Sequence, residues 1–195
     1  MKKIILISLL VISIGYAGNL PADKARGIFV AISVGPRVPF SDFSNSTNIG
    51  YGFSLELAYT DNEYLPVFLF GKVGFEQFSA SQDFYQQSDY AHLSHQFLPL
   101  QVGARYYLPP ILENIIIIIP SIEFGANFLI FQNLHQFKIN SGRANYLEDG
   151  SKFGFTAGVG VSMFLIEALV SYNYYKSTQY IAFDLKVRLP LFVSL

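Results

Sequence analysis

The chain has no cysteine, few charged side chains and, after its first residues, only one apolar stretch that could pass for a membrane-spanning helix. The lack of cysteine excludes disulfide bonds and thiolate metal sites. Charged residues make up 14% of the chain, whereas soluble domains carry about 25%. The formal net charge of −1 offers no basic surface for nucleic acid. The composition therefore indicates a surface that largely faces something other than water.

The first 17 residues have the pattern of a secretory signal peptide. Lys2 and Lys3 supply the positive start, residues 4–14 are apolar, and residues 15–17 suit a cleavage site. The apolar stretch is too short to span a bilayer as a helix, which takes about 20 residues. We therefore predict cleavage after Ala17 and one mature domain over residues 18–195.

The clearest pattern in the mature chain is a strict alternation over residues 51–59. The odd positions are Tyr, Phe or Leu, and the even positions are Gly, Ser, Glu or Ala. Successive side chains of a strand point to opposite faces, so this strand has one apolar face and one small or charged face. The pattern recurs and predicts eight strands, at 27–35, 50–59, 65–78, 94–108, 115–131, 153–164, 167–175 and from 180 to the end.

The connections between these predicted strands alternate in length. The first, third and fifth are long, at 36–49, 79–93 and 132–152, whereas the second, fourth and sixth are short, at 60–64, 109–114 and near 165. The seventh, at 176–179, is the one outer loop that is short. Bacterial outer-membrane barrels have short periplasmic turns and longer extracellular loops. The order therefore predicts a periplasmic N-terminus, with the long loops outside the cell.

Some positions inside the predicted strands need separate explanation. The isoleucines at 115–119 belong to the one helix-like stretch, but consecutive β-branched residues favour a strand. Pro99 and Pro120 lack the N–H that a strand ladder uses, so we expect bulges or fraying at both.

Aromatic side chains gather toward the predicted strand ends. At the long-loop end they are Tyr51, Phe78, Phe131, Phe153 and Tyr174. Such residues are typical of the girdles that lie at the headgroup depth of a membrane.

The distribution of charge decides between a soluble barrel and a membrane barrel. A soluble lipocalin-type barrel places its apolar face inside, around a ligand. Here the apolar face carries no charge on any predicted strand, whereas the other face mixes glycine and serine with a few long charged side chains. We therefore predict an all-β fold, an eight-stranded antiparallel up-and-down transmembrane β-barrel with a narrow polar interior.

This combination of alternating strands, loop order and signal resembles the small eight-stranded outer-membrane barrels, such as the OmpA transmembrane domain, OmpX and OmpW. The resemblance covers residues 27–195. It implies a monomer in the bacterial outer membrane, inserted by the barrel assembly machinery and surrounded by outer-membrane lipids and lipopolysaccharide.

Acidic and basic side chains on the inward face are balanced in number. They are Glu56, Lys72, Glu76, Arg105, Glu123, Asp184, Lys186 and Arg188. Isolated charges in a narrow lumen are costly, so this set predicts a salt-bridge network, and eight strands enclose a space that side chains nearly fill. The network is expected to plug the lumen. As an alternative, re-pairing of the same residues would open a narrow channel for small solutes or ions.

Enzymatic modification of lipid A is a third possibility, because His92, Ser94 and His95 lie at the outer end of one predicted strand. The spacing places His92 and Ser94 on one face and His95 on the other, with no evident carboxylate partner. We interpret the two histidines as polar side chains at the edge of a loop and predict no enzymatic activity, cofactor or metal. The polar outer loops suit recognition or contact with lipopolysaccharide sugars. The leading hypothesis is a non-enzymatic barrel with a structural or surface-interaction role.

Overall fold

The computed structural model describes residues 26–61, 65–111 and 117–194, so the predicted signal peptide lies outside the described residues. The strands are β1 (Arg26–Phe40), β2 (Gly50–Asp61), β3 (Leu65–Ser79), β4 (Tyr90–Tyr107), β5 (Ile119–Phe137), β6 (Tyr146–Met163), β7 (Ile166–Tyr175) and β8 (Thr178–Ser194). Short helical segments lie between them, η1 (Ser41–Asn45), α2 (Gln82–Gln87) and η2 (Ile139–Ser141). Among the described residues, no helix is long and apolar enough to cross a membrane.

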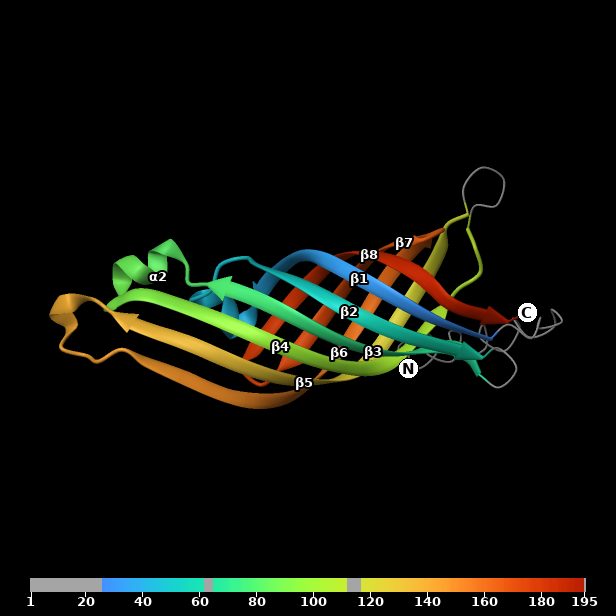
Figure 1. The fold of residues 1–195 in the computed structure, drawn as a ribbon. Helices are drawn as coiled ribbons and strands as arrows, with labels where there is room; N and C mark the ends of the chain where they lie inside the picture. Colours follow the sequence, from blue (N-terminus) through green and yellow to red (C-terminus); the bar gives the residue numbers. More distant parts are fainter. Residues whose placement is uncertain (1–25, 62–64, 112–116, 195) are drawn as a thin grey trace, which may run out of the picture.

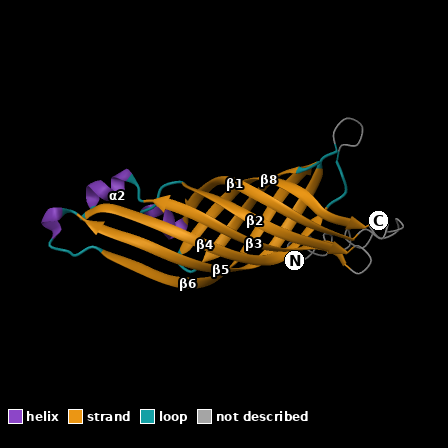
Figure 2. Cartoon of the chain, viewed as in Figure 1, coloured by secondary structure: helices purple, strands orange, loops and turns teal. Residues whose placement is uncertain are grey.

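The eight strands form a closed barrel, which confirms the predicted fold class. Each strand pairs antiparallel with its neighbours in sequence, and β1 also pairs with β8. Figure 1 shows that β1 begins and β8 ends at the same end of the barrel, which we call the terminal end. The helix α2 lies at the opposite end, which we call the helix end (Figure 2).

The alternation in the sequence becomes the two faces of the barrel wall. On β2 the side chains of Tyr51, Phe53, Leu55 and Leu57 are half or more exposed on the outside, whereas Glu56 between them is buried inside. The same alternation of exposed and buried side chains runs along β7. Because the backbone groups around the ring pair within the sheet, an apolar outer wall of this kind is compatible with lipid.

Three strands continue past the rest of the barrel at the helix end. The ladder between β6 and β7 begins only at Gly154, and the ladder between β3 and β4 ends at Ser94. Beyond these points the residue pairs of β4 with β5, and of β5 with β6, continue to Tyr90 and Tyr146. We call this part of β4–β6 the extension, and it is visible at the left of Figure 1.

The extension corrects the predicted loops at 79–93 and 132–152. Most of 132–152 is strand, and β4 already begins at Tyr90 in the first range. The first range also contains α2, in which the backbone amide of Phe84 donates a 3.2 Å hydrogen bond to the hydroxyl of Ser81. The segment 132–152 has little apolar alternation, so its pairing depends on neighbouring strands and not on a local pattern.

The predicted start of the fifth strand at residue 115 is also wrong where it can be tested. Residues 115 and 116 lie outside the described residues, and Ile117 and Ile118 precede β5, which begins at Ile119. The pairs of β4 with β5 end at Tyr107 and Ser121. Pro109 and Pro110 follow β4 and carry no N–H, so the continuous ladder stops there, and only isolated backbone hydrogen bonds, such as that from Ile111 to the carbonyl of Ile118 at 3.0 Å, continue beyond it.

Of the bulges or fraying expected at Pro99 and Pro120, no bulge occurs, because the strand register continues unshifted through both residues, but the ladder is locally interrupted at Pro99. The ring of Pro99 packs beside Gly74, where a Cβ atom would lie 3.2 Å from it, and the β3–β4 ladder skips two pairs there. A register shift occurs instead between β1 and β8, where Phe29 pairs with Pro190. Omitted ladder pairs thus accommodate Pro99 without displacing the strand.

Candidate functional site in the barrel lumen

Arg105 is the centre of the charged network inside the barrel. Its side chain is fully buried and comes from β4, between the carboxylates of Glu56 on β2 and Glu123 on β5. Two guanidinium nitrogens donate hydrogen bonds of 2.7 and 2.9 Å to the two carboxylate oxygens of Glu56. Two more bonds, of 2.9 and 2.6 Å, reach one oxygen of Glu123. Such charge-assisted and bidentate contacts are the strong form of hydrogen bond.

Two basic residues of β8 join this network from the terminal end. The Lys186 ammonium donates a 2.9 Å hydrogen bond to Glu56, and it lies 3.9 Å from Glu167 on β7. The Arg188 guanidinium donates to Glu167 at 2.5 Å and to the hydroxyl of Tyr107. The structure therefore brings five of the predicted lumen residues into one network, which are Glu56, Arg105, Glu123, Lys186 and Arg188.

Glu167 was not among the predicted lumen residues, although it completes this network. Its carboxylate is buried and receives contacts from Lys186 and Arg188. The signal was present in the sequence, because Ala168 and Val170 face outward and place Glu167 on the inner face. With Glu167 included, three acidic and three basic side chains share the network.

A second ion-pair cluster lies nearer the helix end. Arg37 on β1 donates a 2.7 Å hydrogen bond to Glu76 on β3 and a 2.9 Å bond to Asp184 on β8. All three side chains are buried. Glu76 and Asp184 were predicted lumen residues, but Arg37 lies in the segment predicted as a loop. The two carboxylates therefore share Arg37 as a partner. Arg37 lies on a part of β1 that the sequence alternation did not predict to be strand.

Lys72 is the predicted lumen residue that the structure leaves outside both ion-pair clusters. Among the described residues it forms no ion pair, and it borders a small gap that Glu76, Gln101 and Asp184 also line. The gap has a volume of about 10 Å³. This is close to the smallest space that holds one water molecule.

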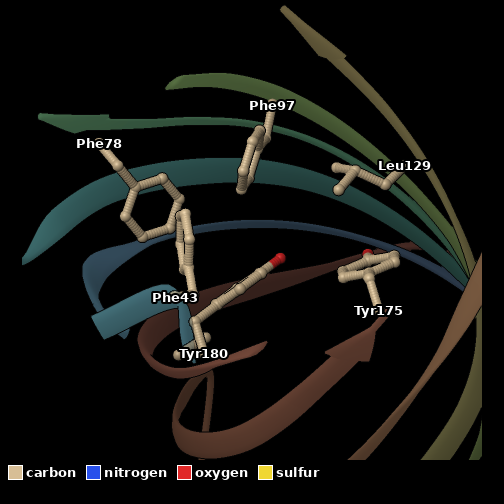
Figure 3. Packing of buried hydrophobic residues seen from close by; sticks show 7 residues of the cluster. Phe43, Phe78, Phe97, Leu129, Tyr175 and Tyr180 are labelled. Atoms are coloured by element: carbon tan, nitrogen blue, oxygen red, sulfur yellow. The ribbon is translucent and has the colours of Figure 1, made fainter. Parts of the chain in front are cut away.

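An apolar cluster occupies the lumen at the helix end, beyond Arg37. Its members are Phe43, Phe78, Phe97, Leu129, Tyr175, Tyr180 and Ala182. Figure 3 shows the Phe43, Phe78 and Tyr180 rings close together. The helix η1 contributes Phe43, whose ring centroid lies 5.2 Å from that of Phe78. The predicted polar interior is therefore replaced by an apolar one at this end.

Phe78 and Phe131 also correct the predicted aromatic girdle. Phe78 is 1% exposed and lies inside, on the same face of β3 as Glu76, and Phe131 packs against the internal cluster. Tyr51, Phe153 and Tyr174 are exposed on the outer wall. Strand parity is therefore the better guide to the position of Phe78, although aromatic character alone suggested the outer surface.

The predicted enzymatic residues do not form a serine–histidine pair. The Ser94 hydroxyl donates a 3.4 Å hydrogen bond to the carbonyl of Phe78, and His95 contacts the Asn133 amide at 2.7 Å. His92 is exposed. Among the described residues, no group of three or more His, Asp or Glu residues is placed to hold a metal ion.

Polar and aromatic contacts order the inner face of the extension. The His135 ring stacks on Tyr146, with ring centroids 4.4 Å apart, and contacts Glu148 at 3.3 Å. Hydrogen bonds from the Asn133 amide and from His135 lower the pKa of the Glu148 carboxyl, which lies beyond the barrel ring. A lowered pKa means that this stabilisation is present at neutral pH and is lost as the pH falls through that pKa.

Comparison with solved structures identifies the fold. The chain is similar to Neisserial surface protein A, NspA, with a TM-score of 0.55 and 15% identity over 86% of this chain and 99% of that protein. Ail of Yersinia pestis matches at a TM-score of 0.47 and 15% identity, over 86% of this chain and 99% of Ail. The N-terminal β-barrel domain of Pseudomonas aeruginosa OprF matches at 0.40 and 12%, over 85% of this chain and 100% of that domain.

No family model matches the chain, and no curated protein is significantly similar to it. The fold is that of the small eight-stranded outer-membrane barrels, as the sequence pattern predicted.

Proposed function

We propose that this protein is a non-enzymatic outer-membrane barrel with a plugged lumen, which acts through its surface in a structural or recognition role. The observation that carries the proposal is the filling of the lumen from Arg188 to Phe43. Paired charges occupy its middle, an apolar cluster occupies the helix end, and the gap beside Lys72, Glu76 and Asp184 has room for about one water molecule.

The energetics of the buried charges support a plug. Arg105 has no solvent exposure and is surrounded by carboxylates on three other strands. Breaking such a pair without a replacement leaves an uncompensated buried charge, which typically costs about 3–5 kcal/mol. A structure that opens for solutes has to meet this cost at several positions.

The extension is the surface that this proposal assigns to recognition. It projects beyond the ring of strands (Figure 1), and contacts among His135, Tyr146 and Glu148 hold its inner face in one arrangement. In this proposal the helix end lies outside the cell and the terminal end in the periplasm. The barrel is a monomer that the assembly machinery inserts, with membrane lipids on its wall and lipopolysaccharide beside the extension.

A narrow gated channel is the second candidate, and one observation favours it. Lys72 forms no ion pair with a described residue, and one carboxylate oxygen of Glu123 is buried without a hydrogen-bond partner. A pair between Lys72 and Glu123 is therefore an alternative to the pair between Arg105 and Glu123. In this mechanism Arg105 is released and a water-filled path forms beside it.

The absence of cysteine provides a direct test of the proposed orientation. Ile139, at the tip of the extension, and Phe164, between β6 and β7 at the terminal end, are both highly exposed. A membrane-impermeant maleimide applied to intact cells should label the variant Ile139→Cys and should leave Phe164→Cys unlabelled. After the outer membrane is permeabilised, both variants should be labelled to the same extent.

The second labelling step serves as the control for expression and thiol reactivity. Labelling of Phe164→Cys but not Ile139→Cys in intact cells would show that the barrel has the opposite orientation. Equal labelling of both variants in intact cells would contradict the membrane placement.

A further inference from the structure

A cavity lies at the terminal end of the barrel, below the charged network. It has a volume of about 450 Å³ and is lined by Phe29, Phe68, Tyr107, Ile119, Pro190 and Arg188, among others. We call this cavity the terminal vestibule. Its volume falls within the range of about 300–1,000 Å³ that is typical of small-molecule sites.

Aromatic rings form one side of the terminal vestibule. The centroids of Phe29 and Phe68 are 5.6 Å apart, and Phe68 meets Tyr107 edge to face at 5.0 Å. These three side chains come from β1, β3 and β4 and are only partly buried. Half-exposed rings that converge from separate strands offer apolar contact area at fixed positions.

Arg188 provides the charged group of the same cavity. Its guanidinium carbon lies 5.7 Å from the Phe68 ring centroid and 5.4 Å from that of Tyr107. Two of its nitrogens donate to Tyr107 and Glu167, whereas Nε is buried and donates to no described residue. The Arg188 side chain is 12% exposed and supplies the positive charge of the cavity lining, so a carboxylate bound beside its guanidinium would be stabilised.

We propose that the terminal vestibule binds a small amphipathic anion, namely a carboxylate with an aromatic or alkyl body. The rings of Phe29, Phe68 and Tyr107 would contact the body, and the Arg188 guanidinium would donate to the carboxylate. A cationic ligand is disfavoured by the positive charge of Arg188, and a pure hydrocarbon cannot accept a hydrogen bond from its guanidinium. This site is separate from the closed lumen, because binding in the vestibule requires no path past Arg105.

The test uses 4-phenylbutyrate as the probe and its uncharged amide as the matched comparison. The natural chain has no tryptophan, so the variant Phe164→Trp places a single fluorescent reporter on a cavity-lining residue. With the full mature barrel in phosphatidylcholine nanodiscs, we expect saturable quenching by phenylbutyrate. The amide should bind at least tenfold more weakly, because it lacks the charge that Arg188 recognises.

Further variants in the reporter background separate the cavity from partitioning into lipid. Arg188→Lys keeps the charge but removes the planar guanidinium with its several donors, and it should weaken phenylbutyrate binding about tenfold. Phe68→Ala should weaken both probes. The control Phe124→Ala removes a ring from the outer wall and should change neither affinity. Equal affinities for the two probes, or equal effects of Phe68→Ala and Phe124→Ala, would contradict the proposal.

Tyr107→Phe tests the role of Arg188 without removing its charge. The substitution keeps the aromatic wall and deletes the hydroxyl that accepts a hydrogen bond from Arg188. We expect at least twofold tighter binding of phenylbutyrate and unchanged binding of the amide. Unchanged affinity for both probes would contradict recognition by the guanidinium. Because these are binding measurements, their failure leaves the conductance test of the closed lumen unaffected.

Discussion

Replacement of Arg105 by methionine is expected to destabilise the barrel by about 3–5 kcal/mol. The side chain is fully buried, and its loss leaves the carboxylates of Glu56 and Glu123 without their main partner. Urea unfolding of the refolded barrel in phospholipid vesicles, followed by circular dichroism, measures the change. Arg143→Met is the matched control, since Arg143 is exposed near the tip of the extension and should change stability by less than about 0.5 kcal/mol.

A double variant distinguishes a lost ion pair from lost packing. Glu123→Gln removes a carboxylate that accepts two hydrogen bonds from Arg105. Combined with Arg105→Met, it should cost at least about 1 kcal/mol less than the sum of the single substitutions, because fewer charges remain uncompensated. Strict additivity, or a loss below about 1 kcal/mol for Arg105→Met alone, contradicts the proposed network.

Gly35→Ala is expected to have the second large effect, a destabilisation of about 1–3 kcal/mol. Gly35 lies on β1 at the seam with β8, and a Cβ atom built there overlaps the carbonyl oxygen of Phe183. Because that atom belongs to the backbone, the seam that closes the barrel has to shift. The same unfolding measurement applies.

Gly71→Ala is the control for this substitution. A Cβ atom at Gly71 on β3 meets no other atom within 4 Å, so the same chemical change creates no overlap. Alanine costs less conformational entropy than glycine in a strand, and Gly71→Ala should therefore be neutral or stabilising by up to about 1 kcal/mol. Equal destabilisation by Gly35→Ala and Gly71→Ala would show that close packing at the seam is unimportant.

Local alternation was sufficient to predict the ring of strands, because side-chain direction in a strand has a period of two residues. That period placed Glu56, Arg105 and Glu123 inside, on three different strands, where the structure joins them. It also placed Lys72 on the inner face, but parity alone does not specify which acids and bases will meet. Partner choice depends on register, which two-residue alternation does not fix.

The missed features depend on contacts between segments distant in sequence. The first strand was predicted to end at residue 35, yet Arg37 still pairs with Ala182 of β8. Similarly, Gln132 belongs to the extension because it pairs with Asp149, although neither residue has a strong strand preference. Prediction from local sequence preferences therefore made these strands shorter at the helix end than they are in the structure.

The internal apolar cluster was missed for a different reason. Aromatic residues near a strand end are typical of a membrane girdle, and this interpretation was applied to Phe78. The side chain faces inward instead, where η1 brings Phe43 against it. No local pattern predicts that a segment between two strands folds back into the lumen.

Single-channel conductance of the wild-type protein in planar lipid bilayers tests the central claim most directly. With the orientation and insertion of the barrel verified, the proposed plug predicts no conductance steps, and Lys72→Met should leave the current unchanged. Discrete steps in the wild type that disappear in Lys72→Met or Glu123→Gln would contradict the plug and support the gated channel.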